Sequence, residues 1–484
     1  MNSVRRQLES LRTLHVDSQP FFLNAGTSPR LLLMRWGAWR LTKVEWVLLA
    51  VVASLAVALL LVRSPVGGAL GLFGFLLPFD AVLVLAQVGR IHIHVTWIVG
   101  AAAGVLLLLT ARLGNRLTTP PQAAVWMGLL IFWGLLSYFW ALNAENTLFR
   151  LPVLALLLFL YFAAASIRPT EKEMATIIWL VILGGFLGAA LSLYEFSRGE
   201  WYISPLATHI PRQLSGRETL GIGGRMTDPN SLGASLILPL SLAVCTLLSS
   251  RTWPRRLLLL GMVGVIGASI LATMSRGALA AVATVFAVLI WRSGARRRVL
   301  LPLVIMGGIV MSMPDIPKRV MQSDRGAGRF DIWQVGLSAF RRYPLFGAGQ
   351  DCFPDAFNQY AHTAPNFVGF SRAPHNIYLG TGVELGLVGL VLLLGAIVRH
   401  FLLAAKGSQA VRDKGLRLQF VAYEAALWGL LVGGFFLDLL WEEYFWLTLM
   451  LIVMTVHVRK AGWEPTYQDS VIARRRYELT RLAG

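Results

Sequence analysis

Charged residues are scarce in this chain. Only 14% of the 484 residues are Asp, Glu, Lys or Arg, whereas soluble domains carry about 25%. Hydrophobic residues make up 56%. A soluble core cannot enclose so much apolar surface, so lipid is the natural solvent. The composition therefore predicts an integral membrane protein and excludes an ordinary soluble enzyme.

Cysteines and nucleotide-binding motifs are also scarce. The two cysteines are Cys245, in an apolar run, and Cys352, in a polar segment. Their placement predicts neither a disulfide nor a metal site. No Walker-type or Rossmann-type glycine loop is present. The alternating His92 and His94 could bind a metal ion, but no third ligand lies near them in the sequence. We therefore expect no metal and no cofactor.

Acidic residues are outnumbered, with 25 Asp and Glu against 44 Lys and Arg and a formal charge of +19. Such an excess could indicate nucleic acid as a partner. However, the basic residues fall mostly in short segments between apolar runs, which is the positive-inside pattern of membrane proteins. We expect membrane lipids and no nucleic acid as partners. The segments predicted to be cytoplasmic are 168–173, 250–256, 292–298 and 406–417.

Thirteen apolar runs have the length of a membrane span, about 20 residues. They lie at roughly 44–62, 67–87, 94–111, 123–142, 148–167, 175–196, 231–249, 256–273, 277–292, 299–313, 376–404, 418–437 and 441–457. Most lack a period of two, which disfavours a β-barrel. The prediction is an all-α, polytopic membrane helix bundle. Thirteen spans would place the basic N-terminal arm outside, and Gly, Pro78 and Asp80 interrupt the run 67–87. The expected number is therefore 12 to 14.

Five regions follow from these runs and from the basic loops. No cleavable signal peptide is expected, because the first 43 residues are polar and basic. The loop of 61 residues at 314–374 is too long for a simple connector. Within it, "FDIWQVGLSAFRR" predicts an amphipathic surface helix and "PLFGAGQ" predicts a turn. The predicted regions are a cytoplasmic arm at 1–43, a transmembrane bundle at 44–313 with a periplasmic loop at about 197–230, a large periplasmic loop at 314–374, C-terminal transmembrane helices at 375–457 and a basic cytoplasmic tail at 458–484.

A histidine stands at the end of the large loop, in "SRAPHNIYLG" (371–380). Pro374 suits the first position of a helix, which predicts that His375 lies in the first helical turn. The helix dipole there disfavours imidazolium, so the ring stays neutral and able to accept a proton. The same helix N-terminus attracts anions. A lone histidine at a helix end can equally be a plain interfacial residue. Glu384 falls about half a turn out of phase with His375 on a straight helix, so it cannot orient this ring.

Arginines are frequent on the predicted outer side, where positive-inside bias selects against them. Guanidinium groups bind phosphate in a bidentate manner. Each arginine alone could contact a lipid headgroup or an acid, but as a group they suggest a pyrophosphate-bearing lipid. They are Arg198, Arg212, Arg217, Arg225, Arg276, Arg325, Arg329, Arg341, Arg342 and Arg372.

The stretch "GRMTDPNSLGASL" (224–236) predicts a turn followed by a helix start. Asp228 and Pro229 form the turn, and Asn230 or Ser231 is expected to cap the helix. This arrangement would hold Arg225 over the outer face.

In their order, "TDPNSLGASL", "MSRGALAA", "GRFDIWQVGLSAFRRYPLFGAGQ" and "PHNIYLGTGVELGLVGL" resemble the O-antigen ligase / O-antigen polymerase superfamily of bacterial envelope glycosyltransferases. The resemblance covers about residues 224–397. It implies a GT-C-like helical enzyme of the bacterial inner membrane that is active at the periplasmic face. The implied donor is a glycan on undecaprenyl pyrophosphate, and the implied acceptor is a hydroxyl of lipid A core or of another glycan.

The resemblance also implies roles for individual residues. His375 corresponds to the essential histidine of the family, and it would accept the acceptor's proton in an inverting displacement. Arg276 and Arg329 correspond to its phosphate-handling arginines, together with Arg225 or Arg217. Donor pyrophosphate binding by Arg372, and support from Asp228, Asn230, Asn376 and Tyr378, complete the expected site.

Three alternatives stay open at this point. Ligase and polymerase differ only in the acceptor, so the sequence does not separate them. An O-linked protein glycosyltransferase is a third branch of the same chemistry. A transporter or flippase for a lipid-linked glycan would instead predict paired broken helices, of which the sequence offers one, at Pro78 and Asp80.

Overall fold

The computed structural model describes residues 43–88, 91–197, 229–273, 275–294, 299–300, 304, 308, 328–366 and 369–458. The chain divides into two compact units, residues 1–55 and 56–484, and the only described part of the first is the beginning of helix α3 (Lys43–Arg63). Almost all of the predicted N-terminal arm, the periplasmic loop at about 197–230, the run 299–313 and the basic tail lies outside the described residues, as do residues 314–327 of the large loop.

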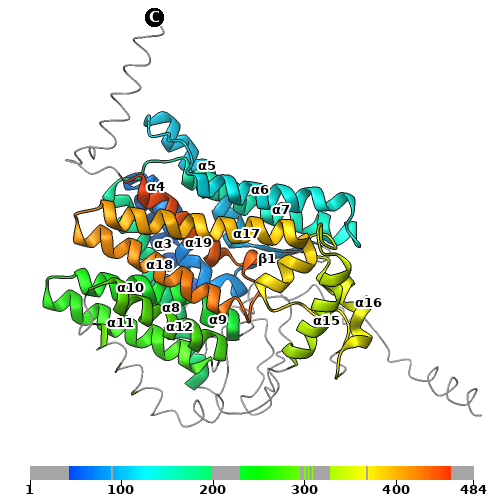
Figure 1. The fold of residues 1–484 in the computed structure, drawn as a ribbon. Helices are drawn as coiled ribbons and strands as arrows, with labels where there is room; N and C mark the ends of the chain where they lie inside the picture. The colour runs from blue at the N-terminus through cyan, green and yellow to red at the C-terminus, as the bar shows by residue number, and fades with distance from the viewer. Residues whose placement is uncertain are drawn as a thin grey trace, which may run out of the picture. The chain divides into compact units, whose positions relative to one another are not determined.

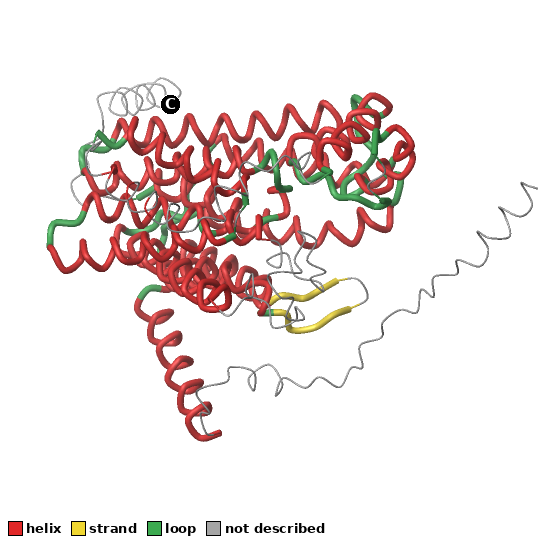
Figure 2. The backbone as a smooth tube through the Cα atoms, turned by 90° about the horizontal axis from the view of Figure 1, so that it is seen from below, coloured by secondary structure: helices red, strands yellow, loops and turns green. Residues whose placement is uncertain are grey.

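Helices dominate the described residues (Figure 1). One antiparallel pair of strands, β1 (Val84–Val88) and β2 (Ile91–His94), is the exception among them (Figure 2). The helices are α3, α4 (Pro65–Leu76), α5 (Val95–Leu113), α6 (Gln122–Leu136), α7 (Ala144–Ala165), α8 (Glu171–Ser197), α9 (Pro229–Ser235), α10 (Ile237–Ser249), α11 (Trp253–Ala272), α12 (Arg276–Arg292), α15 (Arg329–Arg342), α16 (Phe353–Tyr360), α17 (Ile377–Ala410), α18 (Lys414–Gly433) and α19 (Glu443–Val456).

Within the described residues, seven helical segments are long and apolar enough to cross a membrane. Their outward faces carry large aliphatic side chains, such as Leu109, Val391 and Val398, that are about half exposed. Exposed leucine and valine in rows of this kind suit contact with lipid. The all-α, polytopic membrane fold predicted from the sequence is thus confirmed. The segments are Val95–Leu113, Gln122–Phe139, Ala144–Ala165, Glu171–Tyr194, Asn230–Ser249, Trp253–Ala272 and Ile377–Ala410.

The predicted interruption of the run 67–87 is confirmed. Helix α4 ends at Leu76, a 3-10 helix follows over Leu77–Val82, and β1 begins at Val84. Pro78 lies in the 3-10 segment, where its missing N–H and its ring prevent a continuous α-helix. The sequence did not predict the strands, because the apolar alternation at 84–94 is too short to distinguish from the end of a span.

The strand pair brings His94 back to Asp80. The Nδ1 atom of His94 lies 2.9 Å from a carboxylate oxygen of Asp80, and Thr96 donates a hydrogen bond to the same side chain. Burial works against the protonated ring, but the hydrogen bond and charge of Asp80 outweigh burial and raise the pKa of His94. Among the described residues, no group of three His, Cys, Asp or Glu side chains could hold a metal ion. The structure shows His94 in contact with the Asp80 carboxylate.

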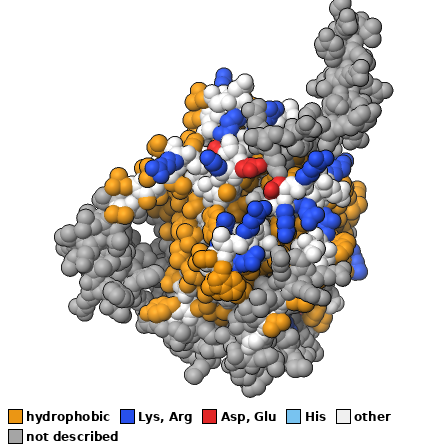
Figure 3. Space-filling model, turned by 90° about the vertical axis from the view of Figure 1, so that its left-hand side faces the viewer, with side chains coloured by type: hydrophobic (Ala, Val, Ile, Leu, Met, Phe, Trp, Pro, Cys, Tyr) orange, Lys and Arg blue, Asp and Glu red, His pale blue; other side chains and the backbone are white. Residues whose placement is uncertain are grey.

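Among the described residues, several consecutive helices are joined by short connections, such as 249–253, 272–276 and 410–414, and these connections lie at two ends of the bundle. The segments 113–122 and 165–171 meet at one end, where Thr118 N donates to Ser166 O at 2.9 Å. We call it the basic end, because Figure 3 shows Lys and Arg gathered there. The opposite end carries α15 and α16, at the right of Figure 1, and we call it the loop end. Basic residues of the basic end are Arg112, Arg116, Arg168, Lys172, Arg251, Arg255, Arg256, Arg292, Lys406, Arg412, Lys414 and Arg417.

The core lies between α7, α17, α18 and α19. Helix α19 is buried along almost its whole length, and Trp446 and Tyr161 are among the largest fully buried side chains. The hydroxyl of Tyr161 lies 2.8 Å from Nε2 of the buried His400, so both polar groups are satisfied inside the bundle. This rigid interior carries the ends of α17 and α18, where the candidate site lies.

Candidate active site

His375 lies immediately before helix α17, not inside it. The helix begins at Ile377, and Asn376 caps it, because its side-chain oxygen accepts the backbone N–H groups two and three residues on, each at 3.0 Å. The prediction that Pro374 starts the helix and that His375 lies in its first turn is therefore wrong. His375 has a φ of +44°, a left-handed conformation that ends the extended segment and turns the chain into the cap.

The start of α17 is held by the end of α18. The backbone N–H of Ile377 donates to Gly434 O at 2.9 Å. The hydroxyl of Tyr378 donates to Leu431 O at 3.0 Å, and its ring lies 4.7 Å from that of Phe435. Tyr378 and Asn376, both predicted to support the site, thus fix the backbone directly after His375. These contacts are structural.

Helix α15 brings Arg329 to the same place. Arg329 is its first residue, and its guanidinium lies 5.8 Å from the centre of the Phe436 ring. One turn later, Trp333 lies 6.2 Å from the same ring and donates from Nε1 to Pro374 O at 3.2 Å. The predicted amphipathic helix is confirmed, and it connects Arg329 to the residue preceding His375.

Arg276 is the first residue of helix α12, directly after the short connection from α11. Ser275 caps this helix by accepting the N–H of Ala278 at 3.1 Å. Gly277 lies against Phe436, because a Cβ added at this glycine would be 3.1 Å from the Phe436 Cβ. Phe436 therefore contacts both Arg329 and the residue next to Arg276.

Asn230, on α9, also contacts the start of α12. We call Asn230, Arg276, Arg329, His375 and Phe436 the cluster. Its side-chain oxygen accepts a hydrogen bond from Ser275 Oγ at 2.6 Å. The predicted helix start after the turn is confirmed, but the expectation that Asn230 or Ser231 caps it is wrong. The helix begins at Pro229, whose fixed φ suits the first position, so Asn230 is already helical and its side chain is available to α12.

The other predicted residues divide into two groups. Arg372 is partly exposed, and its guanidinium lies 3.2 Å from where a Cβ of Gly369 would be. Arg372 lies in the segment that leads to His375. Arg217, Arg225 and Asp228 lie outside the described residues.

Sequence reasoning missed the turn between α18 and α19, "GGFFLDLLW" (433–441). Phe436 in this turn is the contact that unites the cluster. Asp438 lies near the start of α17, because its carboxylate oxygen is 3.8 Å from the Cβ position of Gly380, which itself abuts Pro374. The available signal was two adjacent aromatics at the end of one apolar run, followed by an acid before the next run.

A break in α17 anchors the large loop. Gly386 has a φ of +68°, so the helical hydrogen bonds stop there. The segment 344–349 supplies replacements: Ala348 N donates to Val383 O at 2.8 Å, and Leu387 N donates to Pro344 O at 2.8 Å. Inside a membrane bundle such freed backbone groups must be satisfied by protein. "PLFGAGQ" is thus more than the predicted turn, because it completes a broken membrane helix.

Glu384, beside this break, binds residues of the large loop. Its carboxylate accepts hydrogen bonds from Gln350 Nε2 at 2.8 Å and from the backbone N–H of Phe353 at 3.4 Å.

Burial raises the pKa of the neighbouring Cys352 to about 11. The Cys352 thiol is therefore protonated at neutral pH and unsuited to act as a nucleophile.

The arrangement favours an anion. Helices α12, α15 and α17 all begin around the turn 434–438, and α9 begins beside Ser275. Helix N-termini attract negative charge. Arg276 and Arg329 occupy first helical positions, where a cation is unfavourable by itself. Both arginines and His375 are partly exposed. This end can therefore bind an anion of high charge beside an imidazole.

The fold defines a multi-pass helical membrane protein, and at its loop end Arg276, Arg329 and His375 lie at or next to the starts of three helices. Residues 262–394 match the family model described as O-antigen ligase. The match covers the middle of the chain, and it confirms the resemblance to the O-antigen ligase / O-antigen polymerase superfamily seen in the sequence. At the level of that family it supports an O-antigen ligase- or polymerase-like glycosyltransferase. No curated protein matches the chain.

Proposed function

We propose that the protein is an inverting glycosyltransferase that moves a glycan from undecaprenyl pyrophosphate to an acceptor hydroxyl at the periplasmic face of the inner membrane. One observation carries the proposal: helices α12, α15 and α17, which begin at Arg276, at Arg329 and two residues after His375, start around Phe436. The meeting of these three segments, which are far apart in the sequence, supports a base and two phosphate-binding cations at one place.

His375 is the proposed general base. The imidazole takes the proton of the acceptor hydroxyl while the oxygen attacks the anomeric carbon of the donor sugar. Proton removal by a positioned side chain contributes about 10²–10⁴-fold. Asn376 and Tyr378, through their contacts at the start of α17, hold the backbone that carries this ring.

Arg276 and Arg329 bind the leaving group. As the new glycosidic bond forms, the bond from the anomeric carbon to the pyrophosphate oxygen breaks, and undecaprenyl pyrophosphate leaves with the electron pair. The guanidinium groups and helix N-termini stabilise this added negative charge, which is commonly the larger catalytic contribution. Arg372 and either Arg217 or Arg225 are further candidates for the same role, with Asp228 and Asn230 supporting them.

The orientation in the membrane supports a periplasmic site. Lys and Arg concentrate at the basic end, which the positive-inside rule assigns to the cytoplasm. The loop end then faces the periplasm, where a lipid-linked glycan is available after it has crossed the membrane. The donor carries its own pyrophosphate leaving group, so no nucleotide takes part in the proposed reaction.

The acceptor distinguishes three versions of this function. A ligase transfers to lipid A core, a polymerase to another lipid-linked glycan, and an O-linked protein glycosyltransferase to a protein hydroxyl. Glycans from a deletion strain separate the first two, because loss of a ligase leaves long lipid-linked chains and loss of a polymerase leaves single repeats.

The transporter alternative gains one feature from the structure, since α17 is a second broken helix besides the interruption at Pro78. However, the backbone groups freed at Gly386 are bound by the segment 344–349. In transporters the corresponding groups line a substrate cavity. The break therefore favours a loop anchor over a transport site.

In vitro transfer tests the proposal. Full-length protein is reconstituted with an undecaprenyl-pyrophosphate-linked glycan and candidate acceptors, without nucleotide, and the product is analysed by mass spectrometry and NMR. We expect a new glycosidic bond of inverted configuration and released undecaprenyl pyrophosphate. His375→Ala should reduce transfer by at least about 100-fold. The control His362→Ala, on an exposed histidine of the same loop, should leave it unchanged. Donor movement across the bilayer without a new bond, or a retained configuration, would contradict the proposal.

A further inference from the structure

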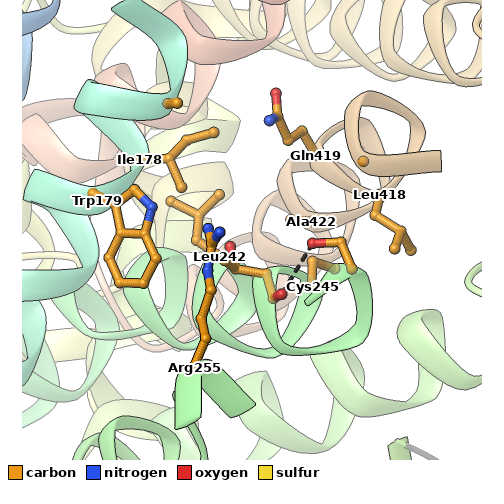
Figure 4. A pocket seen from close by; sticks show the side chains of 12 residues that line it. Ile178, Trp179, Leu242, Cys245, Arg255, Leu418, Gln419 and Ala422 are labelled. Carbon is orange, nitrogen blue, oxygen red and sulfur yellow. Dashed lines mark hydrogen bonds between the residues drawn. The ribbon is translucent and has the colours of Figure 1, made fainter. Parts of the chain in front are cut away.

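A second site lies at the basic end. A cavity of about 90 Å³ opens between α8, α10, α11 and α18 (Figure 4). Its position along α18, near Gln419, is roughly 20 Å from Gly434 at the rise of a helix. It is therefore separate from the candidate active site. The lining residues are Ala175, Ile178, Trp179, Leu242, Cys245, Thr246, Ser249, Arg255, Gly415, Leu418, Gln419 and Ala422.

The size of this cavity limits its ligand. A water molecule takes about 30 Å³ of liquid, so the space holds a group of only a few heavy atoms. Pockets for whole small molecules are about 300–1,000 Å³. A glycan donor cannot enter, but a single headgroup can, with the rest of the ligand outside.

The charge around the cavity favours an anion. Arg255 lies at its edge, exposed, with the guanidinium 5.0 Å from the centre of the Trp179 ring. Helices α11 and α18 both begin beside it, at Trp253 and Lys414, and helix N-termini attract anions. The acid at this place, Asp413, already caps α18 by accepting the N–H of Leu416 at 2.8 Å.

The inner wall offers an unused acceptor. The Oε1 atom of Gln419 is buried, and within the described part of the chain no donor reaches it. Such a group usually has a partner, because an unsatisfied buried polar atom is costly. When the Gln419 amide turns so that Oε1 faces the cavity, a ligand hydroxyl supplies the missing donor, while Arg255 binds a phosphate.

The surface beside the cavity suits acyl chains. Trp253, Leu257 and Leu258 of α11 are 68%, 50% and 54% exposed. Tryptophan is typical of the membrane interface, and the leucines continue from it along the lipid-facing side. A ligand with an anionic, hydroxylated head and apolar tails would therefore fit both the cavity and this surface.

We propose that the cavity binds the headgroup of phosphatidylglycerol from the cytoplasmic leaflet, with its phosphate on Arg255 and a headgroup hydroxyl on Gln419. Bound there, the lipid bridges α8, α10, α11 and α18 at the end of the bundle that lacks the large loop. The site is independent of the glycosyl transfer proposed above.

Native mass spectrometry of the full-length protein tests this site, with dioleoyl phosphatidylglycerol, phosphatidic acid and phosphatidylcholine as probes. We expect phosphatidylglycerol to bind best. Arg255→Gln should weaken its binding about 30-fold, the loss of a charge-assisted bond. The matched controls Arg251→Gln and Arg417→Gln, exposed at the same end, should weaken it by no more than about fivefold. Gln419→Leu should remove the preference over phosphatidic acid.

Three results would overturn the proposal. Equal binding of phosphatidylglycerol and phosphatidylcholine would exclude an anionic site. Equal losses in Arg255→Gln and the two controls would indicate a diffuse basic surface. Complete displacement by millimolar inorganic phosphate would indicate a phosphate site instead of a lipid site. Arg255→Lys, which retains the charge, should keep most of the binding and shows that weaker binding of Arg255→Gln does not come from misfolding.

Discussion

The two ends of the bundle both carry arginine, but they hold it differently. At the basic end Arg116 pairs with Glu173, and Arg292 lies 3.0 Å from Glu424. At the loop end Arg276 and Arg329 begin helices, beside a histidine. The pairs at the basic end each join two separate segments of the chain, whereas Arg276 and Arg329 lie at helix N-termini, where the helix dipole favours an anion over a cation.

The largest expected effect is on the rate of glycan transfer, and it distinguishes the first residue of α15 from its last turn. Arg329→Gln, and likewise Arg276→Gln, should reduce glycan transfer about 10²–10³-fold, because each removes a donor to the leaving group. Arg341→Gln, in the exposed last turn of α15, should change transfer less than about twofold. Rates from purified protein at saturating donor measure this difference. Equal losses in Arg329→Gln and Arg341→Gln would show that α15 acts through general charge alone.

A second prediction concerns the break that anchors the large loop. Gly347 has a φ of +80°, and an added Cβ would lie 2.2 Å from Glu384 O. Gly347→Ala should therefore destabilise the protein by about 3 kcal/mol, from strain and backbone overlap. Gly261→Ala in α11, where a Cβ meets nothing within 4 Å, should not destabilise it. Thermal unfolding followed by tryptophan fluorescence compares the two, and similar losses would contradict the loop anchor.

A third prediction tests Phe436 as the common contact of the cluster. Phe436→Leu removes the ring that faces the Arg329 guanidinium, an interaction of about 0.5–2 kcal/mol. Transfer should fall about tenfold, while the protein stays folded. The control Phe401→Leu removes an aromatic contact with Trp428 elsewhere in the bundle, at 4.5 Å, and should leave transfer within about twofold. If both variants behave alike, Phe436 only fills space.

The smallest effect concerns His94, which also lies at the loop end but outside the cluster. Its pKa is raised by Asp80 despite burial, so folding favours the protonated ring. The stabilisation is fully present below the unfolded pKa of about 6.5 and is lost as pH rises through the raised folded value. The melting temperature of wild type should exceed that of His94→Gln by about 1–2 °C near pH 6, with the gap shrinking above neutrality. A gap that grows with pH would contradict the pairing.

Most of the candidate site could be named from the sequence, but its assembly could not. His375, Arg276 and Arg329 stand in short motifs at the ends of apolar runs, and local patterns of this kind are readable. The position of His375 outside the helix was missed, because Asn376 competed with Pro374 as a start signal and a φ of +44° is not predictable from a histidine. Phe436 was missed because its neighbours are more than 100 residues away in the chain.

The sequence by itself determined the solvent and the class of fold. Hydrophobic content, the length of the apolar runs and the distribution of basic residues are properties of single segments or of the whole composition. They can be read without knowledge of any tertiary contact. Tertiary structure alone decided which residues meet. The bond of Asn230 to Ser275, the insertion of 344–349 at Gly386 and the contacts of Phe436 each join distant segments. Their geometry depends on how helices pack, and helix packing is a property of the whole bundle.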